Sequence, residues 1–142
     1  MRPRLVDDAT ITDCLADLFR SGGYEGVSLG RIEQASGLKR SSLYHRFPRG
    51  KDQMAEIVID HVVELFAANA LAIADGGMSL ADRVVEIGRR VSRFYGSGRF
   101  ACLLDTMSIG PVPERVRAKV ERAMAEWIDA FTALAVEAGL TN

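Results

Sequence analysis

The sequence predicts an all-α protein, with three short helices followed by at least three longer ones. Apolar residues recur at the i, i+3, i+4, i+7 spacing of a helix face along most of the chain, and strand-like alternation is almost absent. Glycine and proline separate the apolar runs, where helices are expected to end. With 142 residues, 48% of them apolar, the composition suits one ordinary globular domain or a small module that shares a core with a larger one.

The first predicted helix has a strong apolar face and clear end signals. The face consists of Ile11, Cys14, Leu15, Leu18 and Phe19. Asp7 or Asp8 can cap its start, and Gly22–Gly23 supplies its stop. We therefore expect this helix to support whatever follows it.

Two shorter helices are predicted next, over about residues 28–47. Ser28 is a good N-cap, and Gly37 ends the first of them after about two turns. The second runs from about Arg40 to Phe47, because Pro48 cannot continue a helix. Two short helices joined by a tight turn with glycine indicate helix-turn-helix geometry.

The remaining helices are longer. One is expected from Lys51 to about Asp75, one from Leu80 to Tyr95, and one from Pro113 or Glu114 to Gly139, with a short apolar piece at 100–110. We divide the chain into an N-terminal unit, residues 1–50, and a helical unit, residues 51–142. The first long helix links the two.

Positive charge is concentrated around the predicted helix-turn-helix. The chain has a formal net charge of −1, yet residues 31–51 hold six cations and a single acid, Glu33. DNA carries about one negative charge per 1.7 Å of its axis, so it is the expected partner of such a cluster. Arginine, lysine, serine and tyrosine are also the residue types that bind phosphates or base edges.

Other functional classes are disfavoured. Ser42 and His45 lie one helical turn apart, but no acid or oxyanion donor accompanies them, so we expect no enzyme. The two histidines and two cysteines have no metal-ligand spacing, and we expect neither a metal nor a cofactor. Lone cysteines and the absence of a long apolar run favour a cytoplasmic protein without a membrane span.

The stretch GYEGVSLGRIEQASGLKRSSLYHRFPRGKDQMAE resembles the DNA-binding domain of the TetR/AcrR family of bacterial transcriptional regulators, over about Ala9–His61. The additional glycine in PRGK resembles the subgroup typified by regulators of multidrug efflux pumps. The resemblance implies a homodimeric repressor that binds a palindromic double-stranded DNA operator. It also implies a C-terminal domain that binds a small apolar or aromatic effector and then releases the DNA.

The resemblance assigns DNA contacts residue by residue. Ser28, Ser42, Tyr44 and Lys51 match phosphate contacts, Arg40 and Ser41 begin base reading, and His45 matches a phosphate or base contact. The predicted DNA-binding residues are Ser28, Lys39, Arg40, Ser41, Ser42, Tyr44, His45 and Lys51.

Two positions depart from the family pattern. Lys39 stands where a serine, threonine or proline cap is common, and Glu33 stands where a small alanine is usual. A buried glutamate would be costly unless it paired, with Arg31 or another nearby cation, or reached the edge of its helix. Arg46 and Arg49 are flanking cations without an assigned role.

The effector site is expected between the later helices. The candidate residues are Phe66, Asn69, Phe94, Tyr95, Cys102, Met107, Met124, Trp127 and Phe131. Asn69 is polar within an apolar stripe, so it would need a partner. His61, in the same stripe, is expected to be a hydrogen-bonded structural residue.

Compared with the family pattern the C-terminal domain is short, so we expect a shortened member, a truncated product, or a protein that dimerises by other surfaces. Family members continue with two further helices that form the dimer interface, whereas this sequence ends with Gly139 to Asn142 after the position of a seventh helix. The alternative function is a truncated helical module that binds a ligand or protein and no longer binds DNA by itself.

Overall fold

The computed structural model describes residues 6–73 and 77–140, which contain helices and no strand. The predicted all-α fold class is confirmed. The elements are α1 (Asp8–Gly22), α2 (Leu29–Ser36), α3 (Arg40–Arg46), α4 (Lys51–Phe66), the π turn η1 (Ala67–Leu71), α5 (Leu80–Phe94), the 3-10 turn η2 (Gly96–Gly98), α6 (Leu103–Ser108) and α7 (Glu114–Glu137).

Local side-chain chemistry fixes the starts of the first two helices, as the sequence predicts. Asp7 Oδ1 accepts a hydrogen bond from the Thr10 backbone N–H at 2.7 Å, and Ser28 Oγ accepts one from the Arg31 N–H at 3.2 Å. Gly37 ends α2 with φ = 70°, a left-handed conformation that glycine adopts without strain. The turn between α2 and α3 is therefore set by the sequence itself.

The expected helix from Lys51 to Asp75 is wrong at its C-terminal end. Regular α4 ends at Phe66, and the π turn closes with a hydrogen bond from the Ala72 N–H to the Ala67 carbonyl, at 2.8 Å. Ala72 is no longer helical, and Asp75 lies outside the described residues. The wider turn interrupts the regular α-helical hydrogen bonding, while Phe66 and Ala70 stay buried at i, i+4 spacing.

Asn69 does not lie on the apolar face of the helix, where it was expected. It lies within η1 and is exposed, and its side-chain amide donates to the Leu65 carbonyl at 2.8 Å. The expectation that Asn69 is a polar group on a buried face is therefore wrong. The physical reason is its side of the helix: Leu65, one turn earlier in regular α4, is 38% exposed, whereas the buried side carries Phe66 and Ala70.

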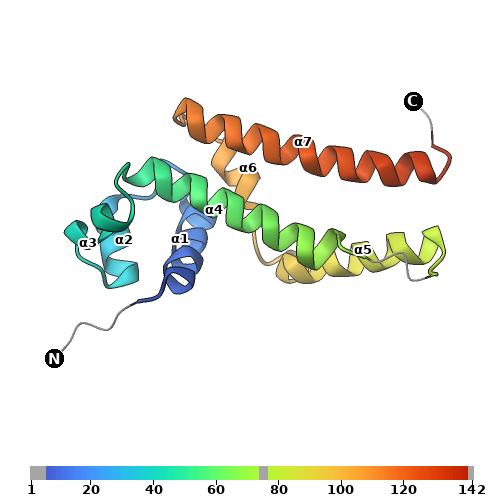
Figure 1. Cartoon of the computed structure of the whole chain (residues 1–142), viewed down its shortest axis with the longest axis horizontal. Coiled ribbons are helices and arrows are strands. Elements are labelled where there is room, and N and C mark those ends of the chain that lie inside the picture. The colour runs from blue at the N-terminus through green and yellow to red at the C-terminus, as the bar shows by residue number, and fades with distance from the viewer. Residues whose placement is uncertain (1–5, 74–76, 141–142) are drawn as a thin grey trace.

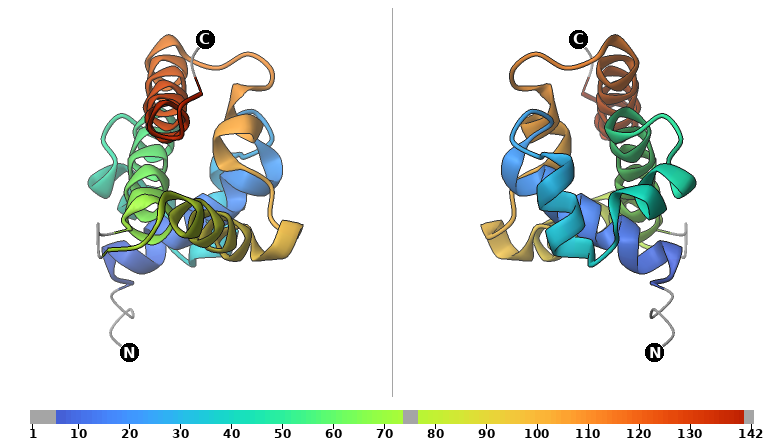
Figure 2. Two further views of the ribbon diagram at one scale, coloured as in Figure 1. Left: turned by 90° about the vertical axis from the view of Figure 1, so that its right-hand side faces the viewer. Right: turned by 90° about the vertical axis from the view of Figure 1, so that its left-hand side faces the viewer.

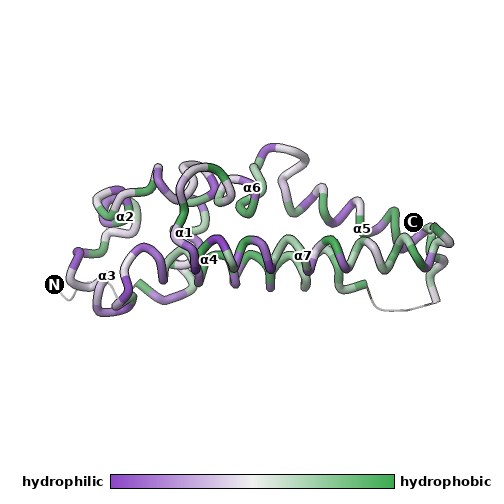
Figure 3. Tube along the Cα trace, turned by 90° about the horizontal axis from the view of Figure 1, so that it is seen from above, coloured by the Kyte–Doolittle hydropathy of each residue, from purple (hydrophilic) through white to green (hydrophobic). Residues whose placement is uncertain are grey.

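One buried cluster joins the N-terminal helices to the later ones. Helix α4 crosses the middle of the molecule, with α1 packed on one side and α7 along another (Figure 1). Helix α6 packs against both α1 and α7. Apolar and polar stretches alternate along the helices, as expected for helices with one buried face (Figure 3). The fully buried side chains with the largest volume include Phe19, Phe66, Ile11, Leu15, Ile32, Leu43 and Met54.

Ion pairs attach α7 and the turn after α3 to α4. Glu56 of α4 is 7% exposed, and its carboxylate accepts from Arg49 at 2.6 Å and lies 3.6 Å from Arg115 of α7. Lys119 of α7 donates to Asp60 of α4. The hydrogen bond from Arg49 holds the pKa of Glu56 below its ordinary value, outweighing the opposite effect of burial.

We expect Glu56→Gln to lower the free energy of unfolding at neutral pH by about 1–2 kcal/mol, because a buried acceptor loses its charge-assisted partners while those partners remain partly solvated. A lowered pKa in the folded state means that this stabilisation is present above the ordinary pKa of Glu56 and is lost as the pH falls through the folded-state value. Thermal unfolding of both proteins, repeated toward low pH, should show the difference shrinking.

The matched control is Glu64→Gln, which removes an exposed carboxylate from the same helix. It should leave stability within about 0.5 kcal/mol of wild type. An equal loss in both variants would contradict the role given to Glu56.

Candidate nucleic-acid interface

Helices α2 and α3 form one end of the molecule, where they pack beside α1 (Figure 2, right). Ile32 of α2 and Leu43 of α3 are fully buried, and Phe47 is 7% exposed. Leu38 in the turn packs partly buried against the same cluster. These apolar anchors hold two helices that are too short to be stable alone and fix which face of α3 remains outside.

The outer face of α3 is polar and exposed. Lys39, Arg40, Ser41, Tyr44 and His45 are all exposed, and Ser42 is half-buried. In the part of the chain that the structure describes, no side-chain hydrogen bond or ion pair engages Lys39, Ser41, Ser42, Tyr44 or His45. The structure thus brings most of the predicted DNA-binding residues to one surface, with donors available to a partner. Ser28 is exposed at the start of α2, where its hydroxyl is used as the helix cap.

Among the six cations of residues 31–51, the basic segment, three arginines connect parts of the fold, in addition to the contacts of Arg40 and Lys51 described below. Arg46 donates to Asp8 at 2.7 Å and to the Val6 carbonyl at 2.8 Å, and so ties α3 to the start of α1. Arg49 is paired with Glu56, and Arg31 donates to the Gly26 carbonyl at 2.6 Å. Half of the apparent charge cluster therefore holds the fold together.

The carboxylate of Glu33 binds Arg40. Its Oε2 accepts from Arg40 Nη2 at 2.8 Å, and its Oε1 accepts from the Arg40 backbone N–H at 2.8 Å. Of the alternatives that the sequence left open, Glu33 pairs with a nearby cation, Arg40, and not with Arg31. The Glu33 side chain is 29% exposed, so it is not a buried charge. Lys39, at the N-cap of α3, makes no side-chain cap hydrogen bond.

Lys51 is held in place at the start of α4. Its ammonium lies 4.1 Å from the centre of the Tyr24 ring and donates to the Tyr24 carbonyl at 3.0 Å. The Tyr24 hydroxyl donates to Asp52, and burial together with this carboxylate raises the pKa of Tyr24. The cation–π contact orients Lys51 without neutralising its charge.

Gly50 is required by close packing next to the outer face. Its φ is 68°, and a Cβ at this position would lie 3.3 Å from the ring of Tyr44. Any other residue would strain the backbone and displace a predicted DNA-binding side chain. The extra glycine therefore has a local structural reason.

Four of the predicted effector residues form an aromatic cluster. Phe66 is 2% exposed and stacks on Trp127 with ring centres 4.1 Å apart, and it meets Phe94 edge-on at 5.4 Å. Tyr95 lies 6.3 Å from Phe66 and donates to Cys102 Sγ at 3.5 Å. The indole Nε1 of Trp127 is buried without a hydrogen-bond partner among the described residues.

The other candidates are not part of the ring stacking, although Cys102 accepts from Tyr95, and Met124 and Phe131 share a hollow with Trp127. Met107 is fully buried, and with Met124 it borders a small hollow of about 140 Å³. Phe131 is 41% exposed on α7. His61, which we expected to be structural, lies with Nε2 3.2 Å from Asp13 Oδ1. The nine predicted effector residues therefore do not line one cavity.

Apolar hollows flank Phe131 on both sides. One, of about 560 Å³, is bordered by Met124, Trp127, Ile128, Phe131, Thr132 and Ala135. Another, of about 500 Å³ between α5 and α7, is bordered by Val84, Ile87, Gly88, Val91, Phe131, Leu134, Ala135, Ala138 and Leu140. Of the α5 residues, the sequence-based prediction included only Phe94, and it missed Val84, Ile87, Gly88 and Val91, which line the second hollow.

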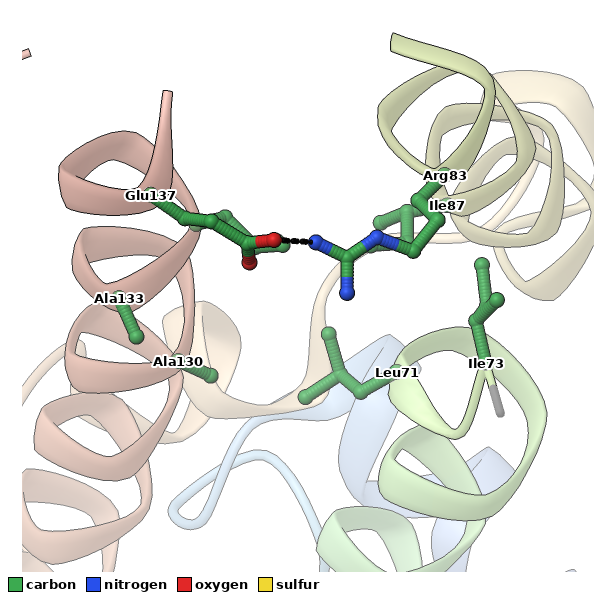
Figure 4. A pocket seen from close by; sticks show the side chains of 8 residues that line it. Leu71, Ile73, Arg83, Ile87, Ala130, Ala133 and Glu137 are labelled. Atoms are coloured by element: carbon green, nitrogen blue, oxygen red, sulfur yellow. Dashed lines mark hydrogen bonds and ion pairs between the residues drawn. The ribbon is translucent and has the colours of Figure 1, made fainter. Parts of the chain in front are cut away.

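A third hollow, of about 220 Å³, lies between α5, α7 and the end of η1 (Figure 4). Arg83 of α5 and Glu137 of α7 point toward each other across it and form an ion pair, while Leu71 lies on the η1 side. This ion pair thus links the first turn of α5 to the last turn of α7.

Within residues 6–73 and 77–140, no helix is long and apolar enough to cross a membrane, and no group of three or more His, Cys, Asp or Glu side chains is placed to hold a metal ion.

The supported pair α2–α3, with a left-handed glycine between its helices and a polar outer face on the second, is a helix-turn-helix unit. Residues 11–58 match the model of the family described as "Bacterial regulatory proteins, tetR family". Residues 11–58 are thus similar to the N-terminal domain of that family, the domain to which the sequence resemblance pointed.

Similar proteins are helix-turn-helix regulators. An uncharacterized HTH-type transcriptional regulator of Mycobacterium tuberculosis (strain ATCC 25618 / H37Rv) is 28% identical over 126 residues, which are 87% of this chain and 60% of that protein. The HTH-type transcriptional repressor ComR of Escherichia coli is 34% identical over 67 residues, 47% of this chain and 31% of ComR. The HTH-type transcriptional regulator LmrA of Bacillus subtilis is 40% identical over 47 residues, 33% of this chain and 25% of LmrA.

The chain thus spans about 60% of the length of the mycobacterial relative. No solved structure matches it.

Proposed function

We propose that this protein is a cytoplasmic DNA-binding transcriptional regulator in which α3 enters the major groove of an operator. The observation that carries the proposal is the outer face of α3, where five side chains able to bind phosphates or bases are exposed or half-exposed and have no partner in the described chain. The buried Leu43 and Phe47 on the opposite side fix this face outward. The match of residues 11–58 to the TetR family supports the same reading.

In this proposal the residues divide into two roles. Ser28, Ser42, Tyr44 and Lys51 hold phosphates, Arg40 and Ser41 read bases, and Lys39 and His45 add contacts at the two ends of α3.

Residues 1–50 form the DNA-binding unit, and residues 51–142 form the regulatory unit. Two copies of the chain bind a palindromic operator, because a dimer places its recognition helices about one DNA turn apart.

The regulator acts as a repressor that a small apolar or aromatic effector releases. The hollows on both sides of Phe131 support this part of the proposal, since their walls are almost entirely apolar. A bound molecule there would touch α7, which Glu56 and Asp60 connect to α4. The similarity of PRGK to regulators of multidrug efflux agrees with an effector of this chemistry.

The test is a gel-shift titration of the 142-residue chain with duplex DNA from around its own gene, repeated at several salt concentrations. We expect retardation that weakens steeply as salt rises, since each phosphate contact adds about 0.9 to the slope of log K against log salt. Light scattering should give the mass of two chains on the DNA. Absence of any retardation at low salt would overturn the proposed function.

The effector is tested on the same complex. Trp127 is the single tryptophan, so its emission reports binding beside the first hollow. A set of small aromatic compounds should include molecules that change this emission and also release the DNA. Compounds that change the emission without affecting a formed complex would contradict release by this site.

A second candidate function is supported by the apolar surface of α5 and α7. The exposed apolar side chains on these two helices include Val84 (49% exposed), Ile128 (64%) and Val136 (61%). Together they form a large exposed apolar surface. A module of this kind would bind a ligand or protein on this surface without binding DNA. It would change the emission of Trp127, but it would not retard duplex DNA in the gel-shift titration.

A further inference from the structure

Glu33 is the single acid within the basic segment, and both of its carboxylate oxygens bind Arg40. We propose that Glu33 is a positioning residue for DNA recognition. It caps α3 in place of the residue at the N-cap position, and it holds the Arg40 guanidinium in an ion pair that favours base reading over phosphate binding. This inference rests on the proposed DNA-binding function.

The capping role follows from the backbone of α3. The first N–H groups of any helix lack partners within the helix, and a side-chain oxygen at the N-cap usually accepts from one of them. Lys39 occupies the N-cap here, and a lysine side chain has no acceptor. Glu33 reaches across the turn from α2 and accepts from the Arg40 N–H at 2.8 Å. Two departures from the family pattern therefore compensate each other.

The positioning role follows from charge. Arg40 is 56% exposed at the outer face, but Glu33 Oε2 binds its Nη2 at 2.8 Å. Arg40 keeps its positive charge, but the Arg40–Glu33 pair as a unit carries none, so it gains little from an arbitrary phosphate and releases few counterions. Its guanidinium has five N–H donors, and the ion pair leaves several available for the O6 and N7 acceptors of a guanine. A fixed guanidinium also loses less conformational freedom on binding.

Glu33 therefore affects selectivity more than affinity. Without its charge, Arg40 would become a mobile cation that binds phosphates of any sequence. The expected consequences are stronger binding to unrelated DNA, a steeper salt dependence, and a weaker preference at the guanine that Arg40 reads.

The test compares Glu33→Gln, Glu33→Ala and Glu25→Gln in the full chain. Glutamine keeps an oxygen that can cap α3 but removes the charge, whereas alanine removes both. Glu25→Gln changes the net charge equally, at an exposed position outside α2 and α3. Each variant is titrated with the duplex that the wild type selects from a randomised library and with a shuffled duplex of the same composition, over a range of salt.

Glu33→Gln should bind the shuffled duplex about three- to tenfold more tightly, and its slope of log K against log salt should be steeper by about 1. The ratio of selected to shuffled affinity should fall accordingly, whereas Glu25→Gln should keep the wild-type ratio. In an Arg40→Ala background, Glu33→Gln should no longer steepen the salt slope. Glu33→Ala should also melt at a temperature lower by about 2–4 °C, because α3 loses its cap.

Equal effects of Glu33→Gln and Glu25→Gln would overturn the positioning role, because net charge alone would then explain them. An unchanged melting temperature in Glu33→Ala would overturn the capping role. Either result leaves the proposed function standing if the wild type binds its selected duplex in a salt-dependent manner. A wild type that selects no duplex overturns the proposed function, and this inference with it.

Discussion

Replacing Phe66 by alanine is expected to lower the free energy of unfolding by about 3–5 kcal/mol, the usual cost of removing a large aromatic side chain from a core. Phe66 is 2% exposed and is the common neighbour of Trp127, Phe94 and Tyr95. Its loss removes the stacked contact with Trp127 and leaves a cavity where α4 meets α5 and α7. Urea unfolding followed by far-ultraviolet circular dichroism measures the change.

Phe131→Ala is the matched control, because it removes the same side chain from a position that is 41% exposed. It should cost less than about 1.5 kcal/mol, as little buried area is lost. If the two variants were equally stable, Phe66 would not be the centre of the aromatic cluster. A Phe66→Ala protein too unstable to purify would agree with the prediction only if Phe131→Ala remained folded.

Replacing Lys51 by alanine is expected to weaken binding to all duplexes alike, by about tenfold at moderate salt, and to reduce the salt slope by about 1. The reason is that a phosphate contact carries no sequence information. Lys51 is oriented at the start of α4 by the Tyr24 ring and carbonyl, so its charge is presented in a fixed place. Gel-shift titrations with the selected and shuffled duplexes give both quantities.

Lys119→Ala controls for the loss of one positive charge. Lys119 lies on α7 and is paired with Asp60, away from α2 and α3. It should change neither the affinity nor the slope by an amount comparable with Lys51→Ala. A Lys51→Ala protein that weakened binding to the selected duplex alone would show that Lys51 reads sequence, against the assigned role.

Much of the N-terminal unit could be predicted because its signals are local. Asp7 and Ser28 cap the helices that follow them through hydrogen bonds within three residues, and Gly37 supplies a conformation that other residues avoid. The period of apolar residues gives the buried face of each helix, and therefore the outer face of α3 by elimination. The polar residues on that outer face could be named without knowing how α1 or α4 packs.

The partners of the charged residues could not be predicted, because they depend on segments distant in sequence. Arg46 binds Asp8, and Glu56 joins Arg49 to Arg115 of α7. A count of six cations treats all of them as available, whereas the folded chain uses Arg31, Arg46 and Arg49 internally. The sequence likewise does not show that regular α4 ends at Phe66, or that Asn69 lies on the exposed side of the helix with Leu65.

By itself, the sequence determined the fold class, the helix-turn-helix and the side chains on its outer face, since helix periodicity and end signals act over a few residues. Only the tertiary structure decided which cations remain available, that Glu33 binds Arg40, and that the predicted effector residues divide between an aromatic cluster and separate apolar hollows. Those outcomes depend on distances between side chains on different helices, which are set when α1 and α7 pack against α4 and α5 packs against η1.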